Sequence, residues 1–556
     1  MASIYGWEKV ESIKSLSDFA PVHQRVSRRN KAAAHQSKIG FSYHLFRWPL
    51  LGLIFLFIYL EFGLYVFLRQ IVTGVEWTVA SVGQRRKRKL VRKLKASTTY
   101  EEWRNTATEL DYALGFQEWK ETDEDPKYDY PLIRKVRKSL VHLRSAGDVT
   151  GLMGVLEICL RNNFAGVEGV RMYSETFLGT KNLIESYVNE VKRSLDYLRE
   201  SPDLSLDDKR RFYRAINKNY GASALCLSGG AGFGYYHFGV VKAFLEADLL
   251  PKVVTGTSAG GIVAALVCTR TDDELRELLV PELADRITAC EDSLLVWLKR
   301  VWKTGARFSP VEWAKKATFF TRGSMTFREA YERTGRALNI SVVPHDQHSP
   351  TKLLNHLTAP DCVIWSAIIA SAAVPGILPG VVLMQKTKAG DLRPMNFGSK
   401  FKDGSLRVDI PLESLHLLFN VNYAIVSQAN PHVHLFFFAP RGSVGSPVSH
   451  RKGKGWRGGF LLSAAEQYLK LELTKNFKVI RDLELMPQLL GSDWSSVFLQ
   501  RFAGSVTILP KSRILDWFRL LNDPDRKELD RMMRVGQQVA WPTLHMIENR
   551  LKVEVS

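Results

Sequence analysis

One stretch decides the fold: Lys252-Val253-Val254-Thr255-Gly256-Thr257-Ser258-Ala259-Gly260-Gly261-Ile262-Val263-Ala264-Ala265-Leu266. A β-branched run ends at Gly256, Ser258 follows two residues later, and a helix-forming apolar run follows Gly260. The order of strand, tight turn and helix, with Gly-x-Ser-x-Gly spacing, is that of a nucleophile elbow. Glycine at both positions leaves room for so sharp a turn. The turn would present the Ser258 hydroxyl at the C-terminal edge of a sheet, beside a helix N-terminus. We therefore predict Ser258 as a nucleophile; the alternative is a turn that merely contains a serine.

A glycine-rich loop lies one strand before the elbow. Residues 224–227 read as a short buried strand and residues 236–250 as an amphipathic helix. The order strand, loop, helix, strand, elbow, helix predicts an α/β fold with a mainly parallel, doubly wound sheet. The loop either cradles a phosphate or forms an oxyanion hole. No acidic residue follows at dinucleotide spacing and no lysine follows in the P-loop arrangement. A nucleophile on the next strand favours the oxyanion hole, with backbone N–H donors among Gly229, Gly230, Ala231, Gly232 and Gly234.

A serine nucleophile needs a base. The histidines after the elbow that we considered have no convincing local setting; they are His345, His348, His432, His434 and His450. A carboxylate placed directly against the serine is the other solution. Asp403, in Asp403-Gly404-Ser405, is the best candidate, and Asp409 is a nearby competitor. The alternative for Asp403 is an exposed aspartate in a turn.

The charge balance points to an anionic partner. The 556 residues carry 77 Lys and Arg against 57 Asp and Glu, a net charge of +20. Such an excess favours nucleic acid or a membrane surface as partner. The five cysteines are scattered and form no Cys-x-x-Cys pair, which argues against a disulfide framework or a zinc site and fits a reducing compartment. The first 40 residues are polar and basic, so we expect no signal peptide.

An apolar segment follows the basic start of the chain. Residues 48–68 carry a single charge, Glu61, and about 20 apolar residues suffice to cross a bilayer as a helix. Trp48 and Arg69 bracket the segment as interfacial anchors. We predict that residues 45–82 insert into a membrane. The segment either spans it or forms a re-entrant hairpin suited to a lipid-droplet monolayer; a buried core helix is the alternative.

A basic cluster follows the apolar segment directly. Eight of the eleven residues 85–95 are Lys or Arg. Beside an apolar segment, such a cluster predicts binding to anionic lipid head groups and marks the cytosolic side. No aromatic residues are interleaved, so we expect no nucleic-acid partner. A solvated linker is the alternative.

The remaining chain divides by composition and periodicity. Residues 97–200 read as helical, with helices at 100–114, 130–143, 149–161 and 180–198. A mostly helical insertion follows the elbow up to residue 340; within it, residues 293–303 suit an interfacial or lid helix. Further strands are expected at 421–428, 434–438 and 504–509. The predicted order is a basic, partly disordered arm (1–44), the membrane segment (45–82), a polybasic linker (83–96), a helical domain (97–200), a catalytic domain (221–440), and a linker with a helical tail (441–556).

Three patches together resemble the patatin-like phospholipase family: residues 227–234, 256–260 and 403–405. The small-residue patch at 370–375 is also similar to one in that family. The helical region, with Tyr100-Glu101-Glu102-Trp103, resembles the domain before patatin in the intracellular triacylglycerol lipases of lipid droplets. The resemblance covers roughly residues 97–440. It implies a three-layer α/β fold, a Ser258–Asp403 dyad without histidine, the glycine loop as oxyanion hole, and neither metal nor cofactor.

The resemblance also shapes what we expect the protein to do. It implies a membrane or lipid-droplet hydrolase of acyl glycerolipids, triacylglycerol or phospholipid, on the endoplasmic reticulum or lipid droplets with its catalytic domain in the cytosol. Ala231, Phe233 and Ser405 depart from the residues common in the family. His356-x4-Asp361 has the spacing of lipid acyltransferases, so a lysophospholipid acyltransferase is one alternative. A non-catalytic lipid-bound scaffold is the other.

Overall fold

A central sheet forms the middle of the predicted catalytic domain. The computed structural model describes residues 41–81, 85–288, 302, 307–344, 349–395, 400–436, 439–448, 455–486 and 496–556. The strands lie in the order β10-β9-β1-β2-β3-β8-β5, and β4 pairs with β3. The parallel strands are β1 (Ala222–Leu227), β2 (Val253–Gly256), β3 (Ala337–Pro344), β9 (Val421–Ser427) and β10 (Val506–Ile508). β4 (Lys352–Leu354) and β8 (Lys400–Asp403) pair antiparallel with β3, and β5 (Val381–Val382) pairs antiparallel with β8. A separate hairpin joins β6 (Met384–Lys386) and β7 (Leu392–Pro394).

The register of the strands brings the predicted site to one edge of the sheet. Leu227 at the end of β1 pairs with Gly256 at the end of β2, so the glycine loop and the elbow leave the sheet together. Gly256 also pairs with Ile340 of β3. Two residues further along β3, Val342 pairs with Asp403 on antiparallel β8. Asp403 therefore reaches the edge from which Ser258 emerges.

Helices cover both faces of the sheet and make it the middle layer of three. Alternate residues of β1 point to opposite sides, as the period of a strand requires: Leu225 and Leu227 join the large core, and Ala224 and Cys226 join a smaller one. The large core includes α10 (Tyr236–Glu246), α11 (Ala259–Cys268), α12 (Asp272–Leu278), α14 (Pro310–Phe320), α15 (Phe327–Thr334), α16 (Ile364–Ser371) and α21 (Arg526–Glu554). The smaller core takes Leu415 of α17 (Leu412–Phe419). The predicted three-layer α/β fold is confirmed.

The C-terminal tail adds a strand to the central sheet and a helix to one of its covering layers. β10 adds an edge strand beside β9, in the predicted position. α21 crosses α10 at two glycines: a Cβ on Gly239 would lie 1.9 Å from the Met533 carbonyl oxygen, and one on Gly536 would lie 2.3 Å from that of Tyr236. The sheet and its cover therefore draw on residues well beyond 440.

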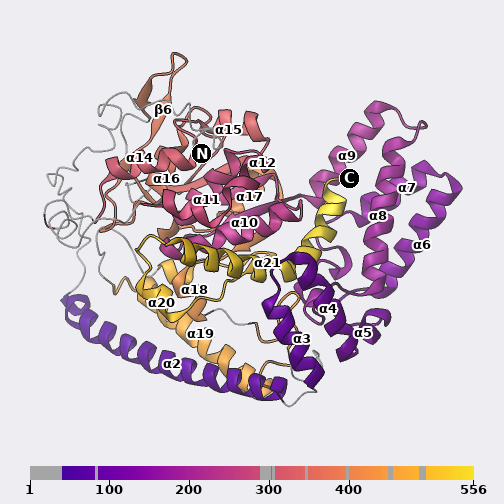
Figure 1. The fold of residues 1–556 in the computed structure, drawn as a ribbon, viewed down its shortest axis with the longest axis horizontal. Helices are drawn as coiled ribbons and strands as arrows, with labels where there is room; N and C mark the ends of the chain where they lie inside the picture. Colours follow the sequence, from indigo (N-terminus) through magenta and orange to yellow (C-terminus); the bar gives the residue numbers. More distant parts are fainter. Residues whose placement is uncertain are drawn as a thin grey trace.

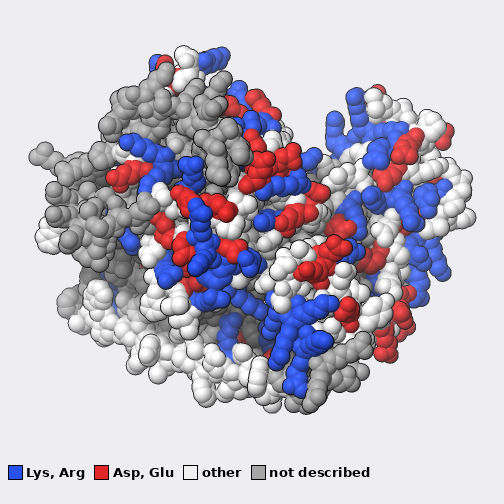
Figure 2. Space-filling view, in the orientation of Figure 1, with Lys and Arg blue, Asp and Glu red and all other residues white. Residues whose placement is uncertain are grey.

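The apolar segment forms one continuous helix, α2 (Phe41–Ser81), with Pro49 inside it. The hairpin alternative is not the geometry of this structure. Leu45–Val79 is long and apolar enough to cross a membrane by length and composition. α2 runs along the catalytic part beside α19 (Phe460–Asp482) (Figure 1). The basic cluster forms α3 (Arg85–Ala96), and Figure 2 shows Lys and Arg side chains gathered there.

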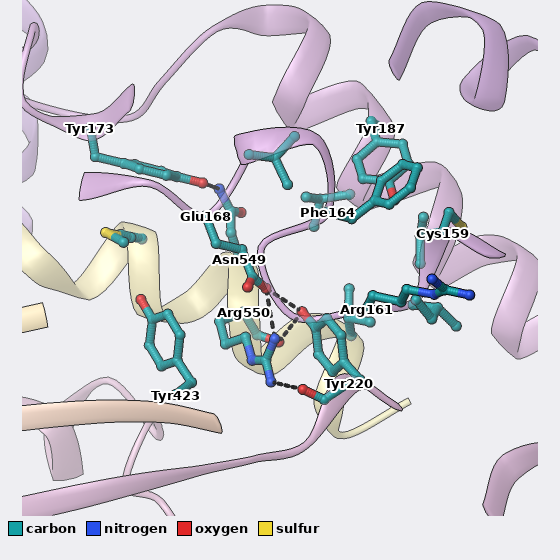
Figure 3. A pocket seen from close by; sticks show the side chains of 16 residues that line it. Cys159, Arg161, Phe164, Glu168, Tyr173, Tyr187, Tyr220, Tyr423, Asn549 and Arg550 are labelled. Carbon is teal, nitrogen blue, oxygen red and sulfur yellow. Dashed lines mark hydrogen bonds and ion pairs between the residues drawn. The ribbon is translucent and has the colours of Figure 1, made fainter. Parts of the chain in front are cut away.

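The predicted helical region is confirmed. The predicted stretch, residues 97–200, contains α4 (Tyr100–Leu114), α5 (Gln117–Glu121), α6 (Tyr130–Ala146), α7 (Val149–Cys159) and α8 (Asn182–Glu200). The helical region also extends beyond it through α9 (Leu206–Tyr220). α21 ties this region to the sheet through Arg550, which is buried. Its guanidinium donates to Glu168 Oε1 at 2.8 Å and to the carbonyls of Tyr220 and Gly221 (Figure 3). The cavity drawn there holds only about 30 Å³.

One predicted strand is wrong. An extended segment is expected at 434–438, but α18 (Pro431–Phe436) is a helix. Proline is favoured at the first position of a helix, and Pro431 occupies that position in α18. A short apolar run does not by itself distinguish a strand from a helix. Residues 1–40 of the predicted arm, and all of the predicted interfacial helix 293–303 except Trp302, lie outside the described residues.

Candidate active site

Ser258 occupies the apex of a strained turn between β2 and α11. Its backbone has φ 53° and ψ −122°, a region that costs a non-glycine residue on the order of 1–3 kcal/mol and recurs at functional sites. A Cβ on Gly256 would lie 2.3 Å from the Gly260 carbonyl oxygen, and one on Gly260 would lie 2.2 Å from that of Leu227. Both glycines are thus required by the close approach of backbone, as the elbow pattern predicts.

Ser371 fixes the backbone of the elbow. The Ser258 N–H donates to Ser371 Oγ at 2.9 Å, and the Ser371 hydroxyl donates to the Ser341 carbonyl at 2.8 Å. Ser371 ends α16, so the small-residue patch at 370–375 lies against the elbow. Sequence reasoning placed Ser371 only within that patch, because nothing local links it to a serine 113 residues away.

Asp403 is fully buried beside Ser258. Its Oδ1 accepts the Ser405 N–H at 2.7 Å, while its buried Oδ2 has no hydrogen-bond partner among the described residues. Burial raises the pKa of Asp403 to about 7, against the lowering effects of Ser405 and of the Ser258 hydroxyl. The structure therefore brings Ser258 and Asp403 together, and the exposed-turn alternative for Asp403 does not hold.

Asp409 lies next to the pair with both carboxylate oxygens bound. Oδ1 accepts the Gly229 N–H at 2.8 Å and Oδ2 accepts Nδ2 of Asn430 at 2.7 Å. Its carbonyl accepts the Thr257 hydroxyl at 2.7 Å. Burial raises the pKa of Asp409 to about 6. These contacts give Asp409 the position of an anchor that joins the glycine loop, the elbow and the end of β9.

The glycine loop bends over Ser258 at Gly230 and Ala231, which have φ of 154° and 49°. Two of its predicted donors are engaged: the Gly229 N–H with Asp409, and the Gly232 N–H with the Leu520 carbonyl at 2.8 Å. Gly234 packs against the residue after the nucleophile, since a Cβ there would lie 2.6 Å from Cβ of Ala259. The predicted donors that make neither of these contacts include the N–H groups of Gly230 and Ala231.

Phe233 departs from the residue common in the family at this position. Its contact with the C-terminal tail accounts for an aromatic residue here. Its ring is fully buried and packs edge-on against Trp517 of α20 (Ile514–Phe518), with centroids 5.4 Å apart. Leu520, three residues after Trp517, accepts the Gly232 N–H. The tail therefore holds the outer side of the loop, a role for which the sequence offers no signal.

Two described histidines, His237 and His432, contact groups other than Ser258. His237 of α10 is buried beneath the glycine loop, with Nδ1 2.8 Å from Ser427 Oγ and Nε2 3.0 Å from the Ser228 carbonyl oxygen. Burial lowers its pKa to about 4. His432 packs against Phe502. His345, His348 and His450, with the His434 side chain, lie outside the described residues.

The acyltransferase-like spacing does not form a pair. The His356 ring stacks on Tyr331 with centroids 3.9 Å apart. Asp361 is bound to Arg328, with Nη2 3.1 Å from Oδ1. Across the described part of the chain, no group of three or more His, Cys, Asp or Glu is placed to hold a metal ion.

An apolar cavity of about 130 Å³ opens beside Ser258. Its walls come from four parts of the chain: the glycine loop with α10, the elbow with α11, the insertion after the elbow, and the tail. Side chains from these parts include Phe238, Ile262, Val263, Phe308, Trp313, Phe320 and Leu521. Arg286, Lys316 and Asn522 add polar groups. Such a lining suits a hydrocarbon chain attached to a polar group.

Comparison with known proteins gives the family. The patatin-like phospholipase profile matches residues 225–416, and a domain of unknown function, DUF3336, matches residues 79–218. A patatin-like phospholipase domain-containing protein of Cryptococcus neoformans is 64% identical over 98% of this chain and 58% of its own length. One of Aspergillus fumigatus is 51% identical over 97% of this chain and 78% of its own.

The chain thus spans about three fifths of the Cryptococcus relative. The solved structure of VipD from Legionella pneumophila covers 56% of this chain and 67% of its own, with 12% identity and a TM-score of 0.26, a distant likeness only. The family assignment rests instead on relatives that match 97–98% of this chain and on the patatin-like phospholipase profile. The chain belongs to the patatin-like phospholipase family, whose members are generally lipid acyl hydrolases, and carries a DUF3336 region before its catalytic domain.

Proposed function

We propose that the protein is a membrane-associated serine hydrolase that cleaves acyl esters of glycerolipids, with Ser258 as nucleophile and Asp403 as base. The observation that carries the proposal is the buried Asp403 carboxyl, with one oxygen unpartnered in the described chain, beside a strained Ser258 at an apolar cavity. A pKa near 7 suits a general base at neutral pH.

The proposed reaction has two steps. The Asp403 carboxylate takes the proton of Ser258 Oγ as that oxygen attacks the ester carbonyl. The N–H groups of Gly230 and Ala231 stabilise the oxyanion. The C–O bond to glycerol breaks, the alcohol leaves with the proton from Asp403, and an acyl-enzyme remains. Asp403 then takes a proton from a water molecule as the water oxygen attacks the acyl carbonyl. The bond from the carbonyl carbon to Ser258 Oγ breaks, Oγ takes the proton back from Asp403, and the fatty acid leaves.

The finer assignment is to triacylglycerol lipases of lipid droplets, with phospholipid as the other substrate class. The helical region, matched by DUF3336, precedes the catalytic domain. It resembles the domain that stands before patatin in that subgroup. The apolar α2 and the basic α3 support a place on the endoplasmic reticulum or lipid droplets, with residues 85–95 on anionic lipids and the catalytic domain in the cytosol. His356 stacks on Tyr331 and Asp361 binds Arg328, so these contacts do not support the acyltransferase motif.

A fluorophosphonate probe tests the nucleophile, and a substrate panel tests the reaction. Wild type should be labelled and should hydrolyse triacylglycerol or phospholipid, whereas Ser258→Ala should do neither. Ser145→Ala, on the exposed face of α6, is the matched control and should behave as wild type. Equal hydrolysis by Ser258→Ala would overturn the dyad. Radiolabelled acyl transfer to lysophospholipid in place of fatty-acid release would establish the acyltransferase instead.

A further inference from the structure

One face of α2 is apolar and exposed along most of the helix. Leu53, Leu56, Phe57, Leu60, Leu64 and Phe67 are each 50–63% exposed. Their spacing places them in one stripe of the helix. Trp48 and Trp77, near the two ends, are 60% and 70% exposed. An exposed apolar surface of this extent marks an interaction site.

The opposite face of α2 is bound to α19 and the residues that flank it. Leu51 and Ile54 pack with Ile480 and Leu485, and Tyr65 packs with Leu469 and Leu473. Four hydrogen bonds join the same parts: Tyr43 Oη to the Glu484 carbonyl (2.7 Å), Arg47 Nε to the Leu485 carbonyl (2.9 Å), Asn476 Nδ2 to Glu61 Oε2 (2.8 Å), and the Gly458 N–H to Glu76 Oε1 (3.1 Å). α2 is therefore held from residue 43 to residue 76.

This pairing is incompatible with α2 crossing a bilayer. α19 carries seven charged residues in 23: Glu466, Lys470, Glu472, Lys475, Lys478, Arg481 and Asp482. Charged side chains are costly at the centre of a bilayer, so α19 cannot accompany α2 across it. α2 has 41 residues and is about 60 Å long at 1.5 Å per residue, about twice the hydrocarbon thickness.

The charge beside this surface points to lipid as the occupant. α3 follows α2 and exposes Arg88, Lys89, Arg92, Lys93 and Lys95. In Figure 2 Lys and Arg side chains gather over α3, beside the largely white band along α2. Basic residues beside an apolar helix face match the anionic head groups and acyl chains of one lipid leaflet. Tryptophans near the helix ends match the same interface.

We propose that α2 and α19 together form a docking face that lies in the plane of an anionic lipid surface. α2 contributes the apolar stripe, and α19 adds the exposed Phe460, Leu461, Tyr468 and Leu471. The lipid location rests on the proposed function; the in-plane geometry rests on the α2–α19 contacts. A face of this kind enters one leaflet only, so it serves a droplet monolayer as well as a bilayer.

A binding measurement on purified protein tests the occupant. The probes are triacylglycerol droplets coated with phosphatidylcholine and phosphatidylserine, and vesicles of the same phospholipids. The double variant Leu56→Glu/Leu60→Glu should lose at least about tenfold in partition to both, because its charges face the acyl region. The matched control is Leu206→Glu/Leu417→Glu, at exposed leucines of α9 and α17, and should stay within about twofold of wild type. Undiminished binding of the first variant would overturn the proposal.

Topology in microsomes tests the in-plane geometry. N-glycosylation tags are placed before residue 41 and after Ser556. Both tags should stay unglycosylated on membrane-bound protein, since neither end crosses; a glycan on either tag would show that α2 spans. Ser258→Ala should bind droplets as wild type does, and Leu56→Glu/Leu60→Glu should hydrolyse soluble p-nitrophenyl butyrate at the wild-type rate. Failure of the dyad is thereby distinguished from failure of the docking face.

Discussion

Replacing Asp403 by asparagine should abolish esterase activity and, at alkaline pH, stabilise the fold. The asparagine side chain keeps an acceptor for the Ser405 N–H but cannot take a proton from Ser258. Burial holds the pKa of Asp403 near 7 instead of 3.8. The unfolded chain therefore releases this proton at lower pH than the native one, and native stability falls as pH rises from about 4 to about 7. Removing the carboxylate removes that penalty.

The pKa of Asp403 sets an upper limit on the gain. A rise from 3.8 to about 7 is roughly three pH units, or about 4 kcal/mol at 1.36 kcal/mol per unit. That full amount applies above pH 7, where the native carboxyl is ionised. At pH 5 the difference is about 1.6 kcal/mol, because the native carboxyl is then protonated and only the unfolded one has lost its proton. At pH 4 the variant and wild type should be nearly equal.

Urea unfolding followed by tryptophan fluorescence at pH 8, 5 and 4 measures the difference in the free energy of unfolding between Asp403→Asn and wild type. Asp391→Asn is the matched control, at an exposed aspartate between β6 and β7, and its midpoint should equal wild type at each pH. A variant that is less stable than wild type at pH 8 would refute the reasoning about the buried charge. A variant that still hydrolyses ester would refute Asp403 as the base.

Three further changes test the surroundings of the dyad. Asp409→Asn should shift the acid limb of the kcat/KM profile to lower pH, because the nearby Asp409 charge raises the pKa of Asp403; rates between pH 5 and 9 measure it. Ser371→Ala should lower kcat about tenfold with little change in KM for a soluble ester. The variant leaves the Ser258 N–H without its acceptor, and an unsatisfied buried donor costs about 1–3 kcal/mol. Ile262→Trp should narrow the cavity and reduce hydrolysis of long-chain p-nitrophenyl esters at least about tenfold relative to butyrate.

The elbow was predictable because its chemistry is local. Two glycines, a serine between them and a β-branched run before them fit one backbone path, and the structure shows backbone within 2.3 Å of the missing Cβ atoms. The helices of residues 97–200 were predictable for a similar reason. Thr99, Asp129 and Asp148 cap them, and glycine follows at the C-terminal end of α4 and α6. These signals operate within a few residues.

The parts that escaped prediction depend on contacts between distant segments. Ser371 holds the Ser258 amide across 113 residues, and Leu520 holds the glycine loop from the tail. Asp409 was considered as a rival base, but only the fold shows that Gly229 and Asn430 already occupy its oxygens. The periodicity of apolar residues indicates which face of a helix or strand is buried. It does not indicate which other element covers that face.

The two buried carboxyls are given different roles by their hydrogen bonds. Asp409 has a donor on each oxygen, and its pKa is about 6; Asp403 has the Ser405 N–H on one oxygen, and its pKa is about 7. Two donors stabilise the ionised form of Asp409, and its negative charge then disfavours ionisation of Asp403. In the proposed reaction, the group that holds the glycine loop therefore adds to the effect of burial, which is the main cause of the raised pKa of Asp403. Asp409 would thus link the position of the proposed oxyanion donors to the basicity of the proposed base.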